Sequence, residues 1–290
     1  MLYETSDCWR QAPNKRVSLF GMSGVGKTTI AKVLRQTKDW FHYSVDYRIG
    51  TKYLGEEIVD NFKKEAMRNP ILREHLLNDS IYISSNLTFD NLSPLSSFLG
   101  KPGNSALGGI PFNEYIKRQK LHKLAEINAT TDTGLFSEKA EEIYGYKHFV
   151  ADTSGSLCEI VNPSDPNDTV LSTLSKNTLP VWIKASDKHL SNLLRIFLSD
   201  PKPMFYKESF LNQMWTKYLQ EQSLSEEKVD PDKFMSFGFR ALIEHRLPIY
   251  EQIATNWGVT VQTQDIEKVA SQDDFIELVA EALDKKSTAL

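Results

Sequence analysis

The sequence predicts an α/β fold in which five parallel strands form a single sheet. Two features of the 290-residue chain support this prediction. Short apolar runs alternate with segments whose apolar residues recur at helical spacing, and strands that alternate with helices form parallel sheets covered on both faces. A glycine-rich loop, residues 21–28, also joins the first apolar run to the first helical segment. Sheets of this kind bind ligands at the carboxyl ends of their strands, which is where this loop falls.

The expected strands are short runs rich in apolar and β-branched residues. In chain order they cover residues 16–20, 40–46, 147–152, 179–185 and 258–262. Helical spacing is found at residues 29–34, after the fourth strand, at 206–219, at 232–257 and near the C-terminus. Strands and helices therefore alternate over most of the chain.

The connection between the second and third strands is far longer than a usual loop. Its helical segments cover 54–77, 111–129 and 138–144, a brief strand is expected at 81–83, and a loop rich in proline and glycine at 91–111. We therefore expect a single domain over residues 1–290 with a mainly helical insertion at 52–146.

The glycine-rich loop, Gly21-Met22-Ser23-Gly24-Val25-Gly26-Lys27-Thr28, matches the phosphate-binding pattern G-x-x-x-x-G-K-[ST] and lies between a strand and a helix, as that pattern requires. Glycines let successive backbone N–H groups point at an anion, and the following helix adds its own N–H groups and the positive end of its dipole. Lys27 is expected to reach the outer phosphates of a nucleoside triphosphate, and the Thr28 hydroxyl to hold Mg²⁺. The expected nucleotide contacts in this segment are Gly21, Ser23, Gly24, Val25, Gly26, Lys27, Thr28 and Thr29. A chance glycine-rich turn is the alternative, and the agreement of the motif with its flanks disfavours it.

Composition narrows the functional classes. The hydrophobic share of 40%, the charged share of 25% and the net charge of −4 are those of an ordinary globular protein, and they do not favour nucleic acid as a partner. The only cysteines, Cys8 and Cys158, support neither a disulfide framework nor a cysteine-based metal site. The N-terminus lacks the layout of a signal peptide, and no apolar run approaches the ~20 residues that span a bilayer. We expect a cytoplasmic protein without a membrane segment.

Beyond the glycine-rich loop, the layout resembles the P-loop small-molecule kinases, above all the shikimate kinase and nucleoside monophosphate kinase group. The matching features are Asp46 after the second strand, Gly155 after the third, the segment at 200–203, and Arg246 with Tyr250 before the fifth strand. The resemblance implies a P-loop NTPase fold, three-layered α/β/α with strand order 2-3-1-4-5. It also implies ATP and Mg²⁺ as cofactors.

The same resemblance suggests roles for individual residues. Asp46 falls at the position of the acid that holds the acceptor hydroxyl, while Ser44 replaces the acid that helps to organise Mg²⁺. Lys202 lies in the segment leading into the lid, and Arg246 corresponds to an arginine that faces the substrate. The insertion at 52–146 has no counterpart in ordinary shikimate kinases, so we expect it to shape a pocket for a different acceptor.

Most of these residues have an alternative structural reading. Asp152 ends an apolar strand, as an Mg²⁺-ordering acid does, or it caps the next helix. Asp46 is either a general base or hydroxyl anchor for the acceptor, or an acid that caps the next helix or pairs with Arg48. Arg195, Lys202 and Arg246 are candidates to bind or stabilise the transferring phosphoryl group, and Arg195 is equally compatible with a solvated helix surface.

Together these features predict a cytosolic Mg-ATP-dependent kinase for an unidentified small molecule, with Lys27, Asp46, Asp152, Lys202 and Arg246 as its catalytic residues. The alternative is an ATP-hydrolysing switch or partner-binding ATPase without a small-molecule acceptor. A kinase of nucleic-acid ends is a third reading, which the acidic balance of the chain disfavours.

Overall fold

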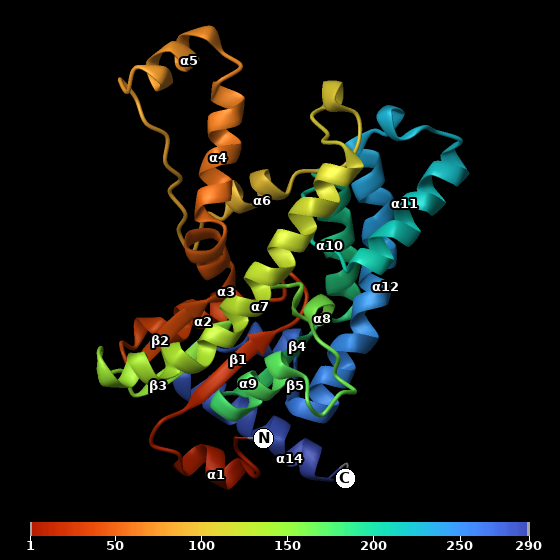
Figure 1. Cartoon of the computed structure of the whole chain (residues 1–290). Helices are drawn as coiled ribbons and strands as arrows, with labels where there is room; N and C mark the ends of the chain where they lie inside the picture. Colours follow the sequence, from red (N-terminus) through yellow and green to blue (C-terminus); the bar gives the residue numbers. More distant parts are fainter. Residues whose placement is uncertain (1, 289–290) are drawn as a thin grey trace. The chain divides into compact units, whose positions relative to one another are not determined.

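The computed structural model describes residues 2–288 (Figure 1). These residues divide into two compact units. The first unit comprises the described parts of 1–45, 126–200 and 238–290, and the second comprises 46–125 and 201–237. Each unit is therefore assembled from segments that are distant in the sequence.

The first unit contains a five-stranded, all-parallel sheet, and its strand order, β2-β3-β1-β4-β5, confirms the predicted order 2-3-1-4-5. The strands are β1 (Arg16–Phe20), β2 (Trp40–Ser44), β3 (His148–Asp152), β4 (Leu179–Lys184) and β5 (Val259–Gln262). This arrangement within an α/β protein is consistent with a P-loop fold.

The apolar runs form the strands because both faces of a parallel sheet are covered. In β1, Val17, Leu19 and Phe20 are all buried, and Phe149 to Ala151 of β3 are buried beside them. The expected second strand was two residues too long. Strand β2 ends at Ser44, and the chain then turns into the short helix α3 (Val45–Arg48).

Helices of the first unit pack along these strands. Helix α2 (Lys27–Gln36) contacts β2 and β3, α9 (Thr169–Asn177) contacts β4, and α14 (Gln272–Thr288) contacts β5. The shorter helices are α8 (Leu157–Ile160) and α13 (Thr263–Ile266), and α10 (Asp187–Ser199) follows β4.

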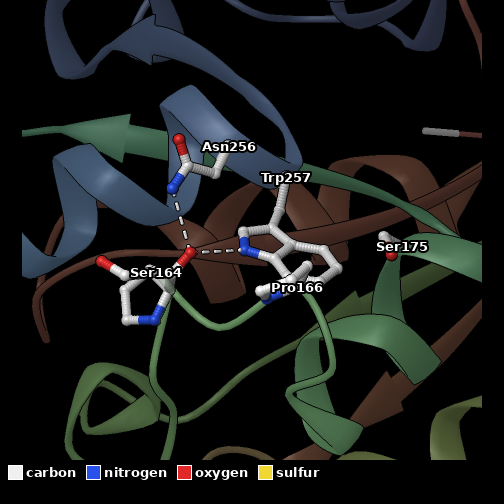
Figure 2. Close-up of a pocket in the computed structure, with 6 residues that line it drawn as sticks. Ser164, Pro166, Ser175, Asn256 and Trp257 are labelled. Carbon is white, nitrogen blue, oxygen red and sulfur yellow. Dashed lines mark hydrogen bonds between the residues drawn. The ribbon is translucent and has the colours of Figure 1, made fainter.

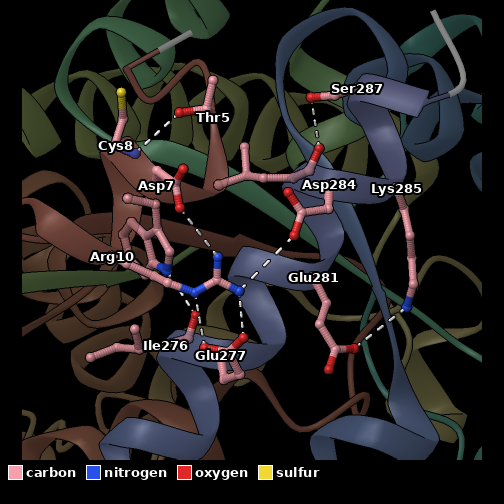
Figure 3. A network of polar contacts seen from close by, with 12 residues as sticks. Thr5, Asp7, Cys8, Arg10, Ile276, Glu277, Glu281, Asp284, Lys285 and Ser287 are labelled. Atoms are coloured by element: carbon pink, nitrogen blue, oxygen red, sulfur yellow. Dashed lines mark hydrogen bonds and ion pairs between the residues drawn. The ribbon is translucent and has the colours of Figure 1, made fainter.

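The N-terminal helix α1 (Ser6–Gln11) lies against α14, near the other end of the chain (Figures 1 and 3). Its Trp9 is fully buried and donates from Nε1 to the Ile276 carbonyl over 2.8 Å. Its Arg10 pairs with Glu277 and lies 4.0 Å from Asp284. This helix escapes a periodicity search because six residues are too few to show a helical repeat.

The second unit is mainly helical. It contains α4 (Gly55–Ala66), α5 (Pro70–Leu77), α6 (Ser93–Leu99) and α11 (Glu208–Gln222). A π-helical segment covers Ile49–Tyr53, and 3₁₀ turns cover Ser105–Leu107 and Glu226–Lys228. Two long helices, α7 (Phe112–Glu142) and α12 (Pro231–Trp257), have residues in both units.

Three local expectations were wrong. Residues 81–83 form no strand, because neither they nor their neighbours pair with another strand. The expected loop at 91–111 contains α6 and a 3₁₀ turn. The helices expected at 111–129 and 138–144 are one helix, because Thr130 and Thr133 are buried and packing outweighs their low helix propensity.

Among the described residues, no helix combines the length and the apolar character needed to cross a membrane.

Candidate functional site

The glycine-rich loop leaves the carboxyl end of β1 with three glycines in a left-handed conformation. The φ angles of Gly21, Gly24 and Gly26 are 138°, 84° and 97°, which other residues rarely adopt. A Cβ on Gly21 would also lie 2.8 Å from the Ile183 carbonyl oxygen of β4. The loop therefore needs glycine both for its curvature and for its close approach to the sheet.

Helix α2 begins directly after the loop, with Gly26 as its N-cap and no side chain capping its first N–H groups. The first turn of α2 also carries no acidic residue. Free N–H groups and the positive end of the helix dipole both attract anions. The loop and the start of α2 thus have the chemistry of a phosphate-binding cradle.

Lys27 lies across this cradle. Its side chain is 7% exposed, and Nζ donates to the carbonyl oxygens of Gly21 and Met22 over 3.0 and 3.1 Å. The ammonium group is therefore held over the loop by the loop's own backbone, where its charge favours an anion at the mouth of the cradle.

Thr28 and Asp152, the two predicted Mg²⁺ ligands, are in direct contact. The Thr28 hydroxyl donates to Oδ2 of Asp152 over 2.6 Å. Strand register explains the proximity, because Asp152 ends β3 beside Leu19 of β1. Mg²⁺ in nucleotide sites is usually held by one or two protein groups together with phosphate oxygens and water. A hydroxyl and a carboxylate at this distance fit that ion.

His42 of β2 lies behind the same carboxylate. Its Nε2 is 3.9 Å from Oδ2 of Asp152, and both side chains are almost completely buried. The predicted Mg²⁺-ordering acid therefore has a hydroxyl on one side and an imidazole on another.

The β3–α8 loop, residues 153–156, packs directly against the glycine-rich loop. Thr153 donates through both its backbone N–H and its hydroxyl to the Leu19 carbonyl, which fixes the start of the β3–α8 loop to β1. A Cβ on Gly155 would lie 3.0 Å from the backbone nitrogen of Ser23. Gly155 is therefore the point at which the two loops meet, and a larger residue there would press on the predicted phosphate cradle.

Two residues of α12, one helical turn apart, hold the Gly155 carbonyl oxygen. Nη1 of Arg246 donates to it over 3.0 Å, and the Tyr250 hydroxyl donates to the same atom. Burial raises the pKa of Tyr250 well above its ordinary value, so the phenol stays protonated and can donate. The predicted substrate-facing arginine is thus engaged with the protein backbone.

Arg246 is also paired with Glu159 of α8. Its Nε donates to Oε1 of Glu159 over 2.7 Å, and Nε2 of His245 lies 3.3 Å from Oε2 of the same carboxylate. Burial alone would raise the pKa of Glu159, but His245 and Arg246 outweigh it and lower that pKa. Burial alone would lower the pKa of Arg246, but the Glu159 carboxylate holds it above its ordinary value. Both groups are therefore charged at neutral pH.

A second polar chain reaches the β3–α8 loop from α7. The Ser156 hydroxyl donates to Oε2 of Glu126 over 2.7 Å and lies 2.9 Å from the Ser154 hydroxyl. Glu126 is fully buried in α7. Its position could not be read from the sequence, because a single glutamate in a long helical segment gives no signal of burial.

Helix α10 approaches the glycine-rich loop through His189 and Leu193. Nε2 of His189 is 3.0 Å from the Gly24 carbonyl oxygen, and Leu193 lies 3.4 Å from where a Cβ on Gly24 would be. Arg195 is two positions further on, nearly opposite Leu193 around the helix, and it bonds to Asn192 over 2.9 Å. The role of Arg195 at the nucleotide stays a prediction.

Asp46 and Lys202 belong to the second unit. Asp46 lies in the first turn of α3, two residues beyond β2. Lys202 lies in a segment without regular secondary structure, which is tied to neighbouring elements of the second unit. Lys101 donates to the Pro201 carbonyl over 2.8 Å, and Tyr115 of α7 donates to the Met204 carbonyl over 2.7 Å. The catalytic roles of Asp46 and Lys202 stay predictions.

A separate pocket of about 400 Å³ lies in the first unit (Figure 2). Asn256 and Trp257 both donate to the Pro163 carbonyl in its wall, over 2.9 and 3.0 Å. These two residues precede β5, so the pocket lies at the amino end of that strand. The glycine-rich loop lies at the carboxyl ends, so this pocket is not part of the candidate site.

The sequence pattern thus located Lys27, Thr28 and Asp152, which the fold brings together. It did not locate Glu126, Glu159 or His189, whose contacts depend on the tertiary fold. No family model matches this chain, and no curated protein matches it either.

Proposed function

We propose that this protein is an Mg-ATP-dependent phosphotransferase that acts on a small-molecule acceptor. The observation that best supports the proposal is the 2.6 Å contact between Thr28 and Asp152, next to Lys27 and the anion-attracting start of α2. A hydroxyl, a carboxylate and an ammonium group around a glycine-rich turn suit a triphosphate with its metal. The preference for ATP over GTP rests on the resemblance to small-molecule kinases.

In this proposal the protein positions the phosphates and Mg²⁺ and provides charged groups around them. The N–H groups of residues 21–29 and the Lys27 ammonium bind the phosphates, while Thr28 and Asp152 are the protein ligands of Mg²⁺. Bound Mg²⁺ would neutralise part of the phosphate charge. Because these donors are already in place, they need little rearrangement as charge shifts during transfer.

The remaining residues are proposed to act on the acceptor side. Asp46 is proposed to accept a hydrogen bond, and then the proton, from the acceptor hydroxyl. Lys202 and Arg195 are proposed to interact with the transferring phosphoryl group, and residues 52–146 to shape the acceptor pocket. Asp46 need not be a strong base, because phosphoryl transfer depends mostly on positioning and charge neutralisation.

The test compares ATP consumption by the protein alone with consumption in the presence of a pooled extract of small metabolites. A phosphotransferase consumes ATP faster with the extract and yields a new phosphorylated product. Asp46→Asn should lower this transfer by ~10²-fold or more while leaving ATP affinity unchanged. Asp60→Asn, at an exposed position of α4, is the matched control. Full transfer by the Asp46→Asn variant would overturn the role given to Asp46.

An ATP-hydrolysing switch is the second candidate, and one observation favours it. Ser44 lies opposite Asp152 in the sheet register, at the place where the resembled kinases carry an additional acid. ATP turnover that is independent of the extract, with no phosphorylated product other than phosphate, would select the switch over the phosphotransferase.

A further inference from the structure

The polar contacts between α12 and the β3–α8 loop have a geometry that a phosphate-binding role for Arg246 does not explain. Arg246 is 1% exposed, and two of its nitrogens are committed to Glu159 and to the Gly155 carbonyl. Tyr250 donates to that same carbonyl oxygen from the next turn of the helix. Both donors therefore converge on one backbone atom of the β3–α8 loop.

The atom they hold lies beside the predicted phosphate cradle. The Gly155 α-carbon faces Ser23, since a Cβ there would lie 3.0 Å from the Ser23 backbone nitrogen. The other end of the β3–α8 loop is fixed to β1 by Thr153. A displacement of Gly155 would therefore also move Ser23, whose backbone N–H is expected to face a phosphate.

Stability alone is a weak reason for such a network. Burying an arginine and a glutamate costs solvation free energy that can exceed their attraction, and apolar replacements are often equally stable. A network of this kind does, however, fix a backbone position firmly, because each of its members is hydrogen-bonded.

We propose that Arg246 and Tyr250 are positioning residues that set the geometry of the glycine-rich loop by holding Gly155 against Ser23. Glu159 keeps Arg246 charged and oriented for this task. Part of the proposal, the effect on nucleotide affinity, rests on the proposed function, whereas the effect on the loop itself does not. Arg246 then acts on the phosphates through the backbone of two loops.

The principal variant is Tyr250→Phe, which removes one hydrogen bond and leaves the ring in the core. Tyr3→Phe is the matched control, because Tyr3 is also buried in the first unit and its hydroxyl bonds to the Asn14 carbonyl and the Arg16 N–H over 3.0 Å each. Tyr3→Phe removes two hydrogen bonds and Tyr250→Phe removes one, so the control should lose at least as much stability. An effect on the glycine-rich loop in Tyr250→Phe alone therefore separates a positioning role from a structural one.

The first measurement is amide hydrogen exchange of the peptide covering residues 21–28, made without nucleotide. Tyr250→Phe should speed exchange there by about fivefold, the factor that corresponds to the loss of one hydrogen bond of ~1 kcal/mol. Tyr3→Phe should leave that peptide unchanged. Equal exchange in both variants, whether both unchanged or both faster, would overturn the proposal.

The second measurement is the dissociation constant for Mg-ATP. Tyr250→Phe should weaken binding by about fivefold, and Gly155→Ala should weaken it as well. In the double variant, the increase in the dissociation constant should be smaller than the product of the two single increases, because both substitutions act through the same contact. A full product would contradict the shared contact. Absence of Mg-ATP binding by the unaltered protein would reject the proposed function, and the exchange experiment would still decide the positioning role.

Discussion

The Thr28–Asp152 contact is a structural feature with a direct chemical test. Asp152→Asn keeps the shape of the side chain but removes the charge that would attract Mg²⁺. We expect the unaltered protein to bind ATP more tightly with Mg²⁺ than without it, and the variant to lose most of that difference. Titration of each protein with ATP, once in the presence of Mg²⁺ and once in the presence of EDTA, measures this difference in affinity. An equal gain from Mg²⁺ in both proteins would show that Asp152 does not serve the metal.

His122 is a residue whose burial predicts a pH dependence of stability. It lies in α7, stacked on Phe205 of the second unit, and burial lowers its pKa from 6.5 to about 4. The unfolded chain therefore binds a proton between those values that the folded chain does not, so stability is lost as the pH falls through this window. The full effect is about 3 kcal/mol.

His122→Gln removes the titrating group and should flatten this part of the pH profile. Urea unfolding at pH 7 and at pH 4.5 compares the variant with the unaltered protein, and His75→Gln, at an exposed position of α5, controls for the substitution. A loss of stability between the two pH values that is as large in His122→Gln as in the unaltered protein would contradict the assignment.

Among the elements, α5 is expected to be the least stable helix of the second unit. It has eight residues and none of them is buried, and Ile71 and Leu77 are each 68% exposed. Helices of this length are marginal without tertiary packing, although Asn69 caps this one. Its amides should exchange within the shortest labelling times, while those of α12 near Tyr250 stay protected. Slow exchange at 70–77 would show that α5 is covered in solution.

The central elements of the fold were predictable because their cause is local. A buried parallel strand is a run of apolar residues, and all five such runs became strands of the sheet. Residues 81–83 have the same appearance but no partner strand, and pairing cannot be read from a short segment alone. The unbroken course of α7 depends on burial of its threonines, which is also a tertiary effect.

The candidate site divides in the same way. Lys27 and Thr28 could be predicted because their spacing within one motif is fixed, and Asp152 because it ends a central strand. The role of Arg246 could not be derived, because its partner Glu159 is 87 residues away in the sequence. The resemblance predicts that Arg246 faces the substrate, whereas in the structure its guanidinium donates hydrogen bonds to the buried Glu159 and to the Gly155 carbonyl.

At the scale of the whole molecule, the residues named in the proposed function are divided between the two compact units. Lys27, Thr28 and Asp152, the residues proposed to bind the nucleotide and its metal, belong to the first unit. Asp46, Lys202 and most of the segment expected to shape the acceptor pocket belong to the second. The residues expected to select the acceptor therefore lie mainly in the second unit, whose sequence contains no motif that indicates a particular acceptor.

Calorimetric titration of Mg-ATP tests most directly whether residues 21–28 bind a nucleoside triphosphate with Mg²⁺. We expect one site per chain, weakened by ~10-fold or more in Lys27→Ala, because a charged hydrogen-bonding group contributes ~1.5–3 kcal/mol. Lys176→Ala, at an exposed position of α9, should bind as the unaltered protein does. Absence of binding by the unaltered protein, or equal affinity in Lys27→Ala, would show that the glycine-rich loop is not the nucleotide site.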